Sequence, residues 1–497
     1  MRCFIDRADE LHFLEKEYNR TGSSLVVLYG RRRVGKTALA AEFLKGKPGV
    51  FFYASEENET ENRAAFREVV AEFTNNELLK NAGSISWDLI FKAWLDSDII
   101  WNAKSCTLPS SPSGAAKGQH EKQNAEVALS QYSTRKKLLI IDEFQYLGKA
   151  NAAFPSVFQR IWDTMLCREN VMVLLCGSHI SMMESQTLAY SSPLYGRRTG
   201  QIRLRQIPFA HYQEFFPQRN EKELIPYYAV TGGIPKYIEL FCDASDVYAA
   251  IEQSILSKSS FLYDEPNFLL RREVSEIGSY FSILKTIAAG NRKLLKIAAA
   301  LEVKQTGLTK YLQTLIELDL VQREVPITEN NPEKSKKGLY KINDNFIAFW
   351  FKFIFPNLHH IESGNASLVL ERIRNNLFDS HVAFVYKDLC IEKTWSLACE
   401  GVWDFTFNKV GRWWNGDTEI DIVAIDGEGG NIVFGECKYT LAKMGADVLR
   451  ALEVKAQSVD WNRHARNNFY ILFCPSGFTN ELVKLSKARK DVVLVSF

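Results

Sequence analysis

The stretch Leu25-Val-Val-Leu-Tyr-Gly-Arg-Arg-Arg-Val-Gly-Lys-Thr37 decides the fold of the N-terminal part of this chain. An apolar run, typical of a buried strand, ends at Gly30, and the pattern Gly-x-x-x-x-Gly-Lys-Thr follows at once. Helix-forming residues come directly after Thr37. A strand, a glycine-containing loop and a helix in this order form a phosphate-binding loop (P-loop). The stretch therefore predicts a nucleoside triphosphate ligand.

The residue types in this loop suit the chemistry of a phosphate chain. Gly30 and Gly35 allow backbone N–H groups to turn inward, and the helix that follows points its positive end at the same anion. We expect Lys36 to reach the β- and γ-phosphates and the Thr37 hydroxyl to ligate Mg²⁺. The predicted nucleotide-binding residues of the loop are Gly30, Arg33, Val34, Gly35, Lys36, Thr37 and Ala38.

A second apolar run at residues 138–141 ends in two acids, Asp142 and Glu143. The run predicts a strand buried on both faces, as in a parallel sheet, and ligands of such sheets bind at the carboxyl ends of the strands. We assign Asp142 to the Mg²⁺ shell and Glu143 to the water that attacks the phosphate. The alternative is a strand end with two solvated acids.

Three further polar residues follow a third apolar run at residues 171–176. Ser178 comes directly after that run and is a candidate sensor of the γ-phosphate; its alternative role is to cap the next helix. Arg197 and Arg198 lie in a predicted turn, where either could act as an arginine finger or form a salt bridge without a phosphate. An arginine that acted on a neighbouring copy would make a homo-oligomer part of the mechanism.

The composition is that of an ordinary globular protein. At 497 residues we expect about three domains, and the 24% charged and 46% hydrophobic residues are balanced. The formal net charge of +2 is too small for a global basic signature, so nucleic-acid contact would need a local patch. The nine cysteines show no zinc spacing. With no membrane-spanning run and no signal-peptide core, we expect a cytoplasmic protein without a membrane partner.

Six segments occur in a specific order through the N-terminal half: Phe4-Ile-Asp-Arg-Ala-Asp-Glu-Leu11, Gly30-Arg-Arg-Arg-Val-Gly-Lys-Thr37, Leu139-Ile-Ile-Asp-Glu-Phe-Gln145, Cys176-Gly-Ser178, Ser192-Pro-Leu-Tyr-Gly-Arg-Arg198 and Gly232-Gly-Ile-Pro235. In these segments the chain resembles the prokaryotic AAA-like ATPases related to the STAND class, which carry a C-terminal domain of unsettled function. The resemblance implies a switch-like ATPase with ATP and Mg²⁺ as cofactors. It also implies that Asp6, Arg7 and the turn that ends at Pro235 flank the adenine base.

A small helical module is predicted after the ATPase. Residues 280–289, 294–301 and 305–318 have helical patterns, and residues 320–325 and 338–342 read as two strands joined by a polar tip. This is a winged helix-turn-helix in outline, which serves either DNA binding or protein docking. The side chains available for DNA contact are Gln305, Thr306, Lys310 and Gln313 of the third helix and Lys334, Lys336 and Lys337 of the tip.

The C-terminal part holds a second chemical pattern. Residues 418–425 and 432–438 read as two strands of a hairpin that carry Asp421 on one strand and Glu436 and Lys438 on the other. The set resembles the core of PD-(D/E)XK nucleases, in which two carboxylates bind Mg²⁺ and a lysine stabilises charge on a phosphodiester. The alternative is a cross-strand salt bridge. An acid from the first helix usually completes this site, and Asp388 is the candidate for a second Mg²⁺ site with Asp421 and Glu436.

Together these patterns predict an α/β fold. A P-loop NTPase core with a parallel sheet is expected at residues 1–205, with a polar insertion at about 102–136. A helical lid at 206–275, a winged helix at 276–345 and a PD-(D/E)XK nuclease-like domain at 346–497 are expected to follow.

Two functional interpretations remain open on the sequence. In the first, an ATP-driven switch controls a DNA-binding or DNA-cleaving C-terminal half. In the second, a regulatory or signalling ATPase carries a catalytically inactive C-terminal domain that recruits partners.

Overall fold

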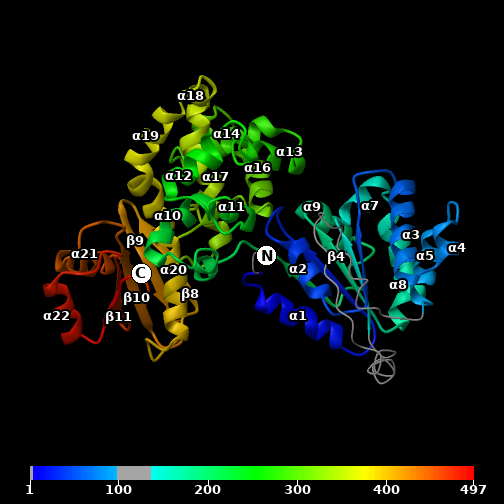
Figure 1. Ribbon diagram of the computed structural model, residues 1–497. Coiled ribbons are helices and arrows are strands. Elements are labelled where there is room, and N and C mark those ends of the chain that lie inside the picture. Colours follow the sequence, from blue (N-terminus) through cyan, green and yellow to red (C-terminus); the bar gives the residue numbers. More distant parts are fainter. Residues whose placement is uncertain (1–3, 98–135) are drawn as a thin grey trace. The chain divides into compact units, whose positions relative to one another are not determined.

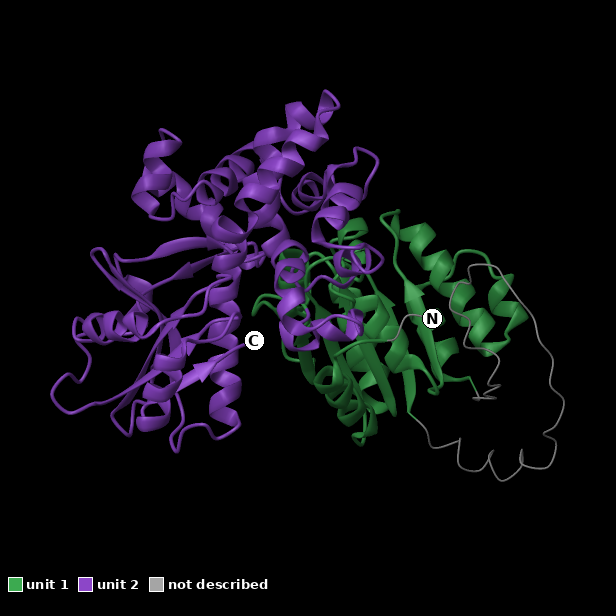
Figure 2. Ribbon diagram, turned by 60° about the vertical axis from the view of Figure 1, so that its left-hand side comes forward, with its two compact units in different colours: residues 1–206 green, residues 207–497 purple. Residues whose placement is uncertain are grey.

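The computed structural model describes residues 4–97 and 136–497 of the chain (Figure 1). The chain divides between Gln206 and Ile207 into two compact units, each of which is described by itself (Figure 2). Except for Lys136, the predicted insertion at 102–136 lies outside the described residues. The expected boundaries after residues 275 and 345 fall inside the second unit and stay predictions.

The first unit is built on a five-stranded parallel sheet in the order β2-β3-β4-β1-β5. Its elements are α1 (Ala8–Asn19), β1 (Ser24–Tyr29), α2 (Lys36–Leu44), β2 (Gly49–Tyr53), α3 (Glu59–Thr74), α4 (Glu77–Lys80), α5 (Trp87–Leu95), β3 (Lys137–Asp142), α7 (Gln145–Ala150), α8 (Phe154–Thr164), β4 (Val171–Gly177), α9 (Ile180–Met183) and β5 (Gly200–Arg203). The predicted parallel sheet is confirmed. In this order β4 lies between the strand of the P-loop, β1, and the strand that ends in Asp142, β3.

Helices cover both faces of this sheet (Figure 1). Along β1, Leu25 and Val27 point into a core that includes Phe66 of α3, Ile90 of α5 and Phe158 of α8. On the opposite face, α2 packs against β3 and β4. Because both faces are covered, the strands need continuous apolar runs, which is why β1, β3 and β4 could be recognised in the sequence.

The second unit begins with helices and ends in a mixed five-stranded sheet. Its elements are α10 (Glu221–Thr231), α11 (Pro235–Glu239), α12 (Val247–Ile251), α13 (Glu265–Glu273), α14 (Ile277–Ala288), α15 (Leu294–Ala300), α16 (Gln305–Glu317), β6 (Val321–Glu324), β7 (Leu339–Ile342), α17 (Asn345–Phe349), α18 (Leu358–Glu362), α19 (Ala366–Leu377), α20 (Ala383–Cys399), β8 (Lys409–Asn415), β9 (Thr418–Ile425), β10 (Asn431–Cys437), α21 (Ala446–Ala456), β11 (Asn467–Phe473), α22 (Asn480–Ala488) and β12 (Val492–Val495). The three predicted helices are confirmed as α14, α15 and α16. The two strands that follow are confirmed as the antiparallel pair β6 and β7.

The last sheet has the order β12-β11-β10-β9-β8. The strands β8, β9 and β10 are antiparallel neighbours, whereas β11 and β12 continue the sheet in parallel with β10. The predicted hairpin is confirmed as β9 and β10, and its turn is closed by Asp426, which accepts hydrogen bonds from the N–H groups of Glu428 and Gly429. Apolar side chains of α21, among them Leu449 and Leu452, pack on one face of this sheet.

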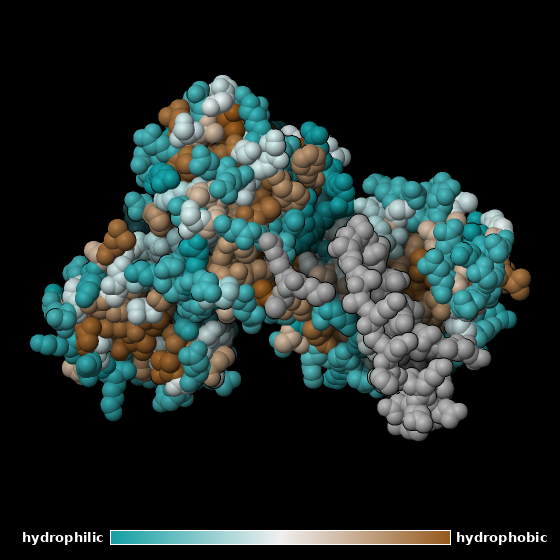
Figure 3. Space-filling model, viewed as in Figure 1, coloured by the Kyte–Doolittle hydropathy of each residue, from teal (hydrophilic) through white to brown (hydrophobic). Residues whose placement is uncertain are grey.

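The surface drawn in Figure 3 is hydrophilic over much of both units, with patches of hydrophobic residues between. Within residues 4–97 and 136–497, no helix combines the length and the apolar character that crossing a membrane would require.

Candidate functional site

The loop between β1 and α2 has the backbone that a phosphate-binding loop needs. Gly35 has a φ of 97°, in the left-handed region that glycine tolerates best. At Gly30 a Cβ atom would lie 2.3 Å from the carbonyl oxygen of Leu204, so only glycine fits beside that strand end. The first helical residue of α2 is Lys36, which places the N-terminus of the helix against the loop.

The side chain of Lys36 is buried inside this loop. Its Nζ donates hydrogen bonds of 2.8 Å to the carbonyl of Gly30 and of 2.7 Å to that of Arg31. Burial lowers the pKa of Lys36 to about 8, although Glu143 and Asp142 act to raise it. A phosphate chain would supply the negative charge that this buried ammonium group lacks.

The predicted metal ligands of the P-loop lie together. The Thr37 hydroxyl donates a hydrogen bond of 2.7 Å to Oδ2 of Asp142, and Oδ1 of Asp142 accepts the backbone N–H of Glu143 at 2.9 Å. Burial raises the pKa of Asp142, and the hydrogen bond from Thr37 acts in the opposite direction. A hydroxyl and a carboxylate are oxygen ligands that suit Mg²⁺, so this pair fits the ion that the P-loop implies.

Glu143 links the tips of two neighbouring strands. Its Oε2 accepts a hydrogen bond of 2.7 Å from the Ser178 hydroxyl, directly after β4, and another from Nε2 of Gln145. The backbone at Glu143 is strained, with a φ of 54°. Ser178 does not cap the next helix, whose N-cap is His179. Sequence reasoning missed Gln145, whose position two residues after Glu143 was the only available signal.

The remaining candidates of the first unit have partners of their own. Arg197 forms a two-point ion pair with Asp163, in which Nη2 of Arg197 lies 2.8 Å from Oδ2 of Asp163. Arg198 donates to the Leu188 carbonyl at 3.1 Å and stacks on Tyr195. The ion pair corresponds to the salt-bridge alternative for Arg197. An arginine-finger role for either residue stays a prediction.

The residues expected around the adenine base belong to different units. Arg7 is buried, with a left-handed φ of 77°, and donates hydrogen bonds to the carbonyls of Val34 at 3.2 Å and Arg205 at 2.6 Å. Arg7 therefore contacts the P-loop directly. Oδ2 of Asp6 lies 3.8 Å from Nη1 of Arg7. Pro235 begins α11 in the second unit. Adenine contact by these residues stays a prediction.

In the second unit the candidate acid Asp421 is paired with a lysine. Nζ of Lys387 on α20 lies 2.5 Å from its Oδ1, and the backbone N–H of Cys437 donates to its Oδ2 at 3.1 Å. Burial acts to lower the pKa of Lys387, but Asp421 raises it. The contact with Cys437 ties Asp421 to β10, one residue after Glu436. Sequence reasoning missed this contact, because nothing in the local pattern pairs Lys387 of α20 with Asp421 of β9.

Glu436 is paired with two lysines. Its Oε1 lies 3.3 Å from Nζ of Lys438, and its Oε2 lies 3.0 Å from Nζ of Lys455 on α21. The salt bridge to Lys438 was the alternative to a catalytic site. Lys455 was missed, because helix α21 begins nine residues after β10 and nothing in the local pattern pairs it with Glu436.

The structure does not bring Asp388 into this group. Asp388 forms an ion pair with Lys341 of β7. Across residues 4–97 and 136–497, no three His, Cys, Asp or Glu side chains are grouped as a metal ion would require. The predicted three-acid set of Asp388, Asp421 and Glu436 is therefore not assembled. Each of these carboxylates is instead paired with a lysine, which takes the place of a metal cation.

The side chains expected to contact DNA are at the surface. All of the following residues of α16 and of the tip between β6 and β7 are exposed: Gln305, Thr306, Lys310, Gln313, Lys334, Lys336 and Lys337. Two of them have acidic neighbours, since Gln313 donates to Glu317 at 3.0 Å and Lys337 lies 2.9 Å from Glu329.

Two protein-family models match this chain, one over the first unit and the start of the second, and the other within the second unit. A family model described as an ATPase domain predominantly from Archaea matches residues 4–241. Another, described as archaeal and bacterial proteins of unknown function, matches residues 350–448.

Several relatives match. An uncharacterised protein of Methanocaldococcus jannaschii is 33% identical over 436 residues, which cover 88% of this chain and 87% of that protein. An uncharacterised ATP-binding protein of the same organism is 52% identical over 44 residues, 9% of this chain and 75% of that protein. Among solved structures, a Walker-type ATPase of Pyrococcus abyssi is similar with a TM-score of 0.49 and 19% identity, covering 70% of this chain and 96% of that one.

The identity and coverage of the first relative decide the family. We conclude that the chain belongs to the same family as this Methanocaldococcus jannaschii protein and carries an ATPase domain of the type found predominantly in Archaea, followed by a C-terminal domain shared with archaeal and bacterial proteins of unknown function.

Proposed function

We propose that this protein is an ATP-hydrolysing switch whose ATPase unit controls a C-terminal half that binds or cleaves DNA. The observation that carries the ATPase part is the 2.7 Å hydrogen bond from Thr37 to Asp142. It joins the loop hydroxyl and the strand-end carboxylate that would both face one Mg²⁺ ion. The match to an archaeal ATPase domain supports the same conclusion.

Each residue of this site has a role in the proposed reaction. The phosphates of ATP would replace the carbonyls of Gly30 and Arg31 as acceptors for Lys36. Glu143 would orient the attacking water, and Ser178 would sense the γ-phosphate from the tip of β4. Mg²⁺, when bound, would neutralise part of the negative charge on the phosphates.

The test of the ATPase part is hydrolysis by the full chain and by Asp142→Asn. We expect the variant to bind ATP in the presence of EDTA but to lose Mg²⁺-dependent hydrolysis. Asp96→Asn, which changes an exposed acid of the same unit, should hydrolyse ATP like the wild type. Hydrolysis at the normal rate by Asp142→Asn would contradict the assignment.

A winged helix is supported by three helices followed by an antiparallel hairpin. The helices are α14, α15 and α16, and the hairpin is β6 and β7. We infer that α16 acts as the recognition helix and the lysines of the hairpin tip contact phosphates. Under this proposal DNA affinity falls with rising salt concentration, and Lys310→Ala lowers it further.

A nuclease-like C-terminal domain is supported by the order of its elements. Helix α20 precedes three antiparallel strands, and α21 then leads to the parallel strand β11. In the nuclease version of the proposal, Asp421 and Glu436 would release Lys387 and Lys455 and would hold Mg²⁺, which would supply charge neutralisation at the phosphodiester. Lys438 then stabilises charge on the phosphodiester.

The lysine partners favour a second candidate function, a C-terminal half that recruits a partner without cleaving DNA. Each candidate carboxylate already has an ammonium partner, which a metal ion would have to replace. In this version the ATPase is regulatory and the C-terminal domain is catalytically inactive.

One experiment separates the two versions. Supercoiled, linear and single-stranded DNA are incubated with the full chain and Mg²⁺ or Mn²⁺, with ATP, with ADP and without nucleotide. Cleavage that disappears in Asp421→Ala, but persists in Asp417→Ala at the exposed β8–β9 turn, supports the nuclease. Nucleotide-dependent DNA binding without cleavage supports a switch whose C-terminal half binds DNA, whereas the absence of both DNA binding and cleavage supports recruitment of another partner. DNA binding that is equal in ATP, in ADP and without nucleotide would contradict the switch.

A further inference from the structure

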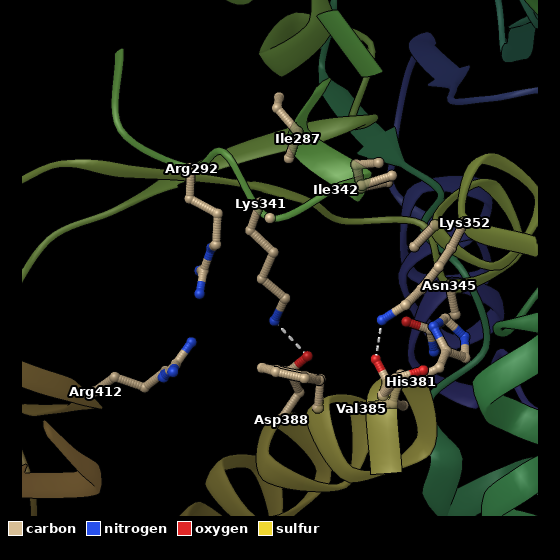
Figure 4. A pocket seen from close by; sticks show the side chains of 15 residues that line it. Ile287, Arg292, Lys341, Ile342, Asn345, Lys352, His381, Val385, Asp388 and Arg412 are labelled. Atoms are coloured by element: carbon tan, nitrogen blue, oxygen red, sulfur yellow. Dashed lines mark hydrogen bonds and ion pairs between the residues drawn. The ribbon is translucent and has the colours of Figure 1, made fainter. Parts of the chain in front are cut away.

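A pocket of about 160 Å³ within the second unit is lined by residues that, apart from Asp388, have no role in the functions proposed above (Figure 4). Its walls come from the end of α14, from β7, from α17 and the turn after it, from α20 and from β8. A cavity needs only about 10–15 Å³ to hold one water molecule. The pocket therefore has room for a small ligand.

The lining of this pocket is strongly positive. Four cations line it, Arg292, Lys341, Lys352 and Arg412, against one acid, Asp388. Figure 4 shows Arg292 and Arg412 pointing toward one another on one side and Lys352 beside His381 on the other. Cations from separate elements that converge on one cavity are the arrangement that binds anions.

Three of the four cations have carboxylate partners. Lys341 pairs with Asp388, and Arg292 and Arg412 share Glu324 at 2.6 Å and 3.4 Å. Although burial acts to raise it, these neighbouring cations lower the pKa of Glu324, so this partner stays ionised. Arg412 also contacts Glu419. The four cations of the lining are therefore balanced by three carboxylates, which leaves one positive charge in excess.

Lys352 carries the excess charge. Its Nζ donates to the carbonyl of Ser380, and the rings of Phe353 and Phe384 lie 5.9 Å and 5.7 Å away. Among the described residues, no carboxylate forms an ion pair with Lys352. Burial lowers its pKa, as expected for an ammonium group held without a counter-ion.

Two more groups offer unused hydrogen-bonding capacity. Nε of Arg412 is buried without an acceptor in the part of the chain that the structure describes, and the Arg412 side chain is only 8% exposed. Nε2 of His381 donates to the Ala229 carbonyl at 2.7 Å, which leaves Nδ1 as an acceptor. Burial lowers the pKa of His381 to about 4, so the ring is neutral at neutral pH.

We propose that this pocket binds the phosphate group of a small ligand, with Lys352 as the counter-ion and Arg412 as a donor. Unlike sulfate, a phosphate group that retains a proton can donate a hydrogen bond to His381. The bound anion would contact Lys352 in the turn after α17, His381 directly before α20 and Arg412 of β8, so ligand binding would stabilise the contact between these helical segments and the last sheet of this unit.

The test uses the full chain with Lys36→Ala, so that the P-loop loses its phosphate partner. Calorimetry is carried out with inorganic phosphate, glycerol 3-phosphate and sulfate. Adding Lys352→Met should weaken phosphate binding about tenfold or more, because one charge-assisted hydrogen bond is lost. Lys352→Arg keeps the charge and should retain binding. Lys285→Met, which changes an exposed lysine of α14 that also lies over a phenylalanine ring, should have no effect.

The outcomes are distinct. Tighter binding of phosphate identifies the free ion as the ligand, and tighter binding of glycerol 3-phosphate identifies a phosphomonoester. Loss of binding in Lys352→Met with an unchanged melting temperature, and recovery in Lys352→Arg, support the site. Absence of saturable phosphate binding at millimolar concentrations, equal binding by Lys352→Met, or sulfate binding as tight as that of phosphate would overturn the proposal.

Discussion

At the end of β3, the acid Asp142 is held by a hydroxyl group and a backbone amide, whereas Asp421 in the second unit is held by the ammonium group of Lys387. The lysine of the first site, Lys36, donates its hydrogen bonds to two carbonyl groups of the loop and not to Asp142 or Glu143. Neutral donors orient a carboxylate without cancelling its charge, and a lysine cancels it. The carboxylate of the first site therefore stays available to a cation, whereas the carboxylates of the second site could bind one only after releasing their lysines.

The largest effect should come from removing the charge partner of the phosphates. Lys36→Ala should lower ATP hydrolysis roughly 10³-fold, because no other ammonium group is buried in the loop. Phosphate release measures this effect. Lys45→Ala, at the exposed end of α2, should stay within error of the wild type, and unchanged turnover in Lys36→Ala would remove the basis of the comparison.

The second prediction concerns the water-orienting acid. Glu143→Gln should keep ATP bound but slow hydrolysis roughly 10²-fold, because the amide can no longer take the proton of the attacking water. Single-turnover hydrolysis together with nucleotide-binding measurements separates the two steps. Weakened binding with normal turnover would show that Glu143 acts on the nucleotide and not on the water.

The third prediction tests the lysine partner in the second unit. Lys387→Met leaves the buried carboxylate of Asp421 without its cation and should destabilise the protein by about 3 kcal/mol in urea unfolding. Mn²⁺ should restore part of this stability in the variant and add little to the wild type. Lys393→Met, on the same helix, serves as control. Equal stabilisation of the wild type by Mn²⁺ would show that the lysine does not block the metal.

The fourth prediction is a pH dependence. Without nucleotide the pKa of Lys36 is about 8, and bound phosphates should raise it, so ATP binding takes up a proton above that pH. ATP affinity should therefore fall up to about tenfold per pH unit above 8. The nucleotide-free protein should gain stability over the same range, as the pH rises from about 8 toward 10.5.

Its control is Lys36→Arg, whose guanidinium stays charged throughout. Calorimetric titration with ATP at several pH values measures the slope. The same slope in Lys36→Arg would assign the pH dependence to another group.

The smallest effect should come from the link between β3 and β4. Ser178→Ala removes one of the two donors to Glu143 and should reduce turnover about fivefold, the value of one hydrogen bond, with ATP affinity unchanged. Ser181→Ala, an exposed hydroxyl three residues further on, should have no effect. If Ser178→Ala instead lowered ATP affinity, Ser178 would be assigned a direct contact with the nucleotide.

The elements that were recognised from the sequence carry strong local patterns. The strands β1, β3 and β4 contain continuous apolar runs because the sheet is covered on both faces, and the helix α16 has a clear apolar side. The short strand β5 was not recognised, since its four residues are mixed in character and only pairing with β1 makes them a strand. In the same way, Lys455 meets Glu436 only through the packing of α21 on the sheet.

The sequence by itself determined the P-loop, because its glycines, Lys36 and Thr37 are neighbours in the chain and their chemistry depends on local geometry. It also determined which acids lie within strands or at their ends. Only the tertiary structure decided the partners of those acids: a hydroxyl for Asp142, and lysines from separate helices for Asp421 and Glu436. The physical reason is that the charge state of a carboxylate site depends on groups brought close by folding, which no local pattern records.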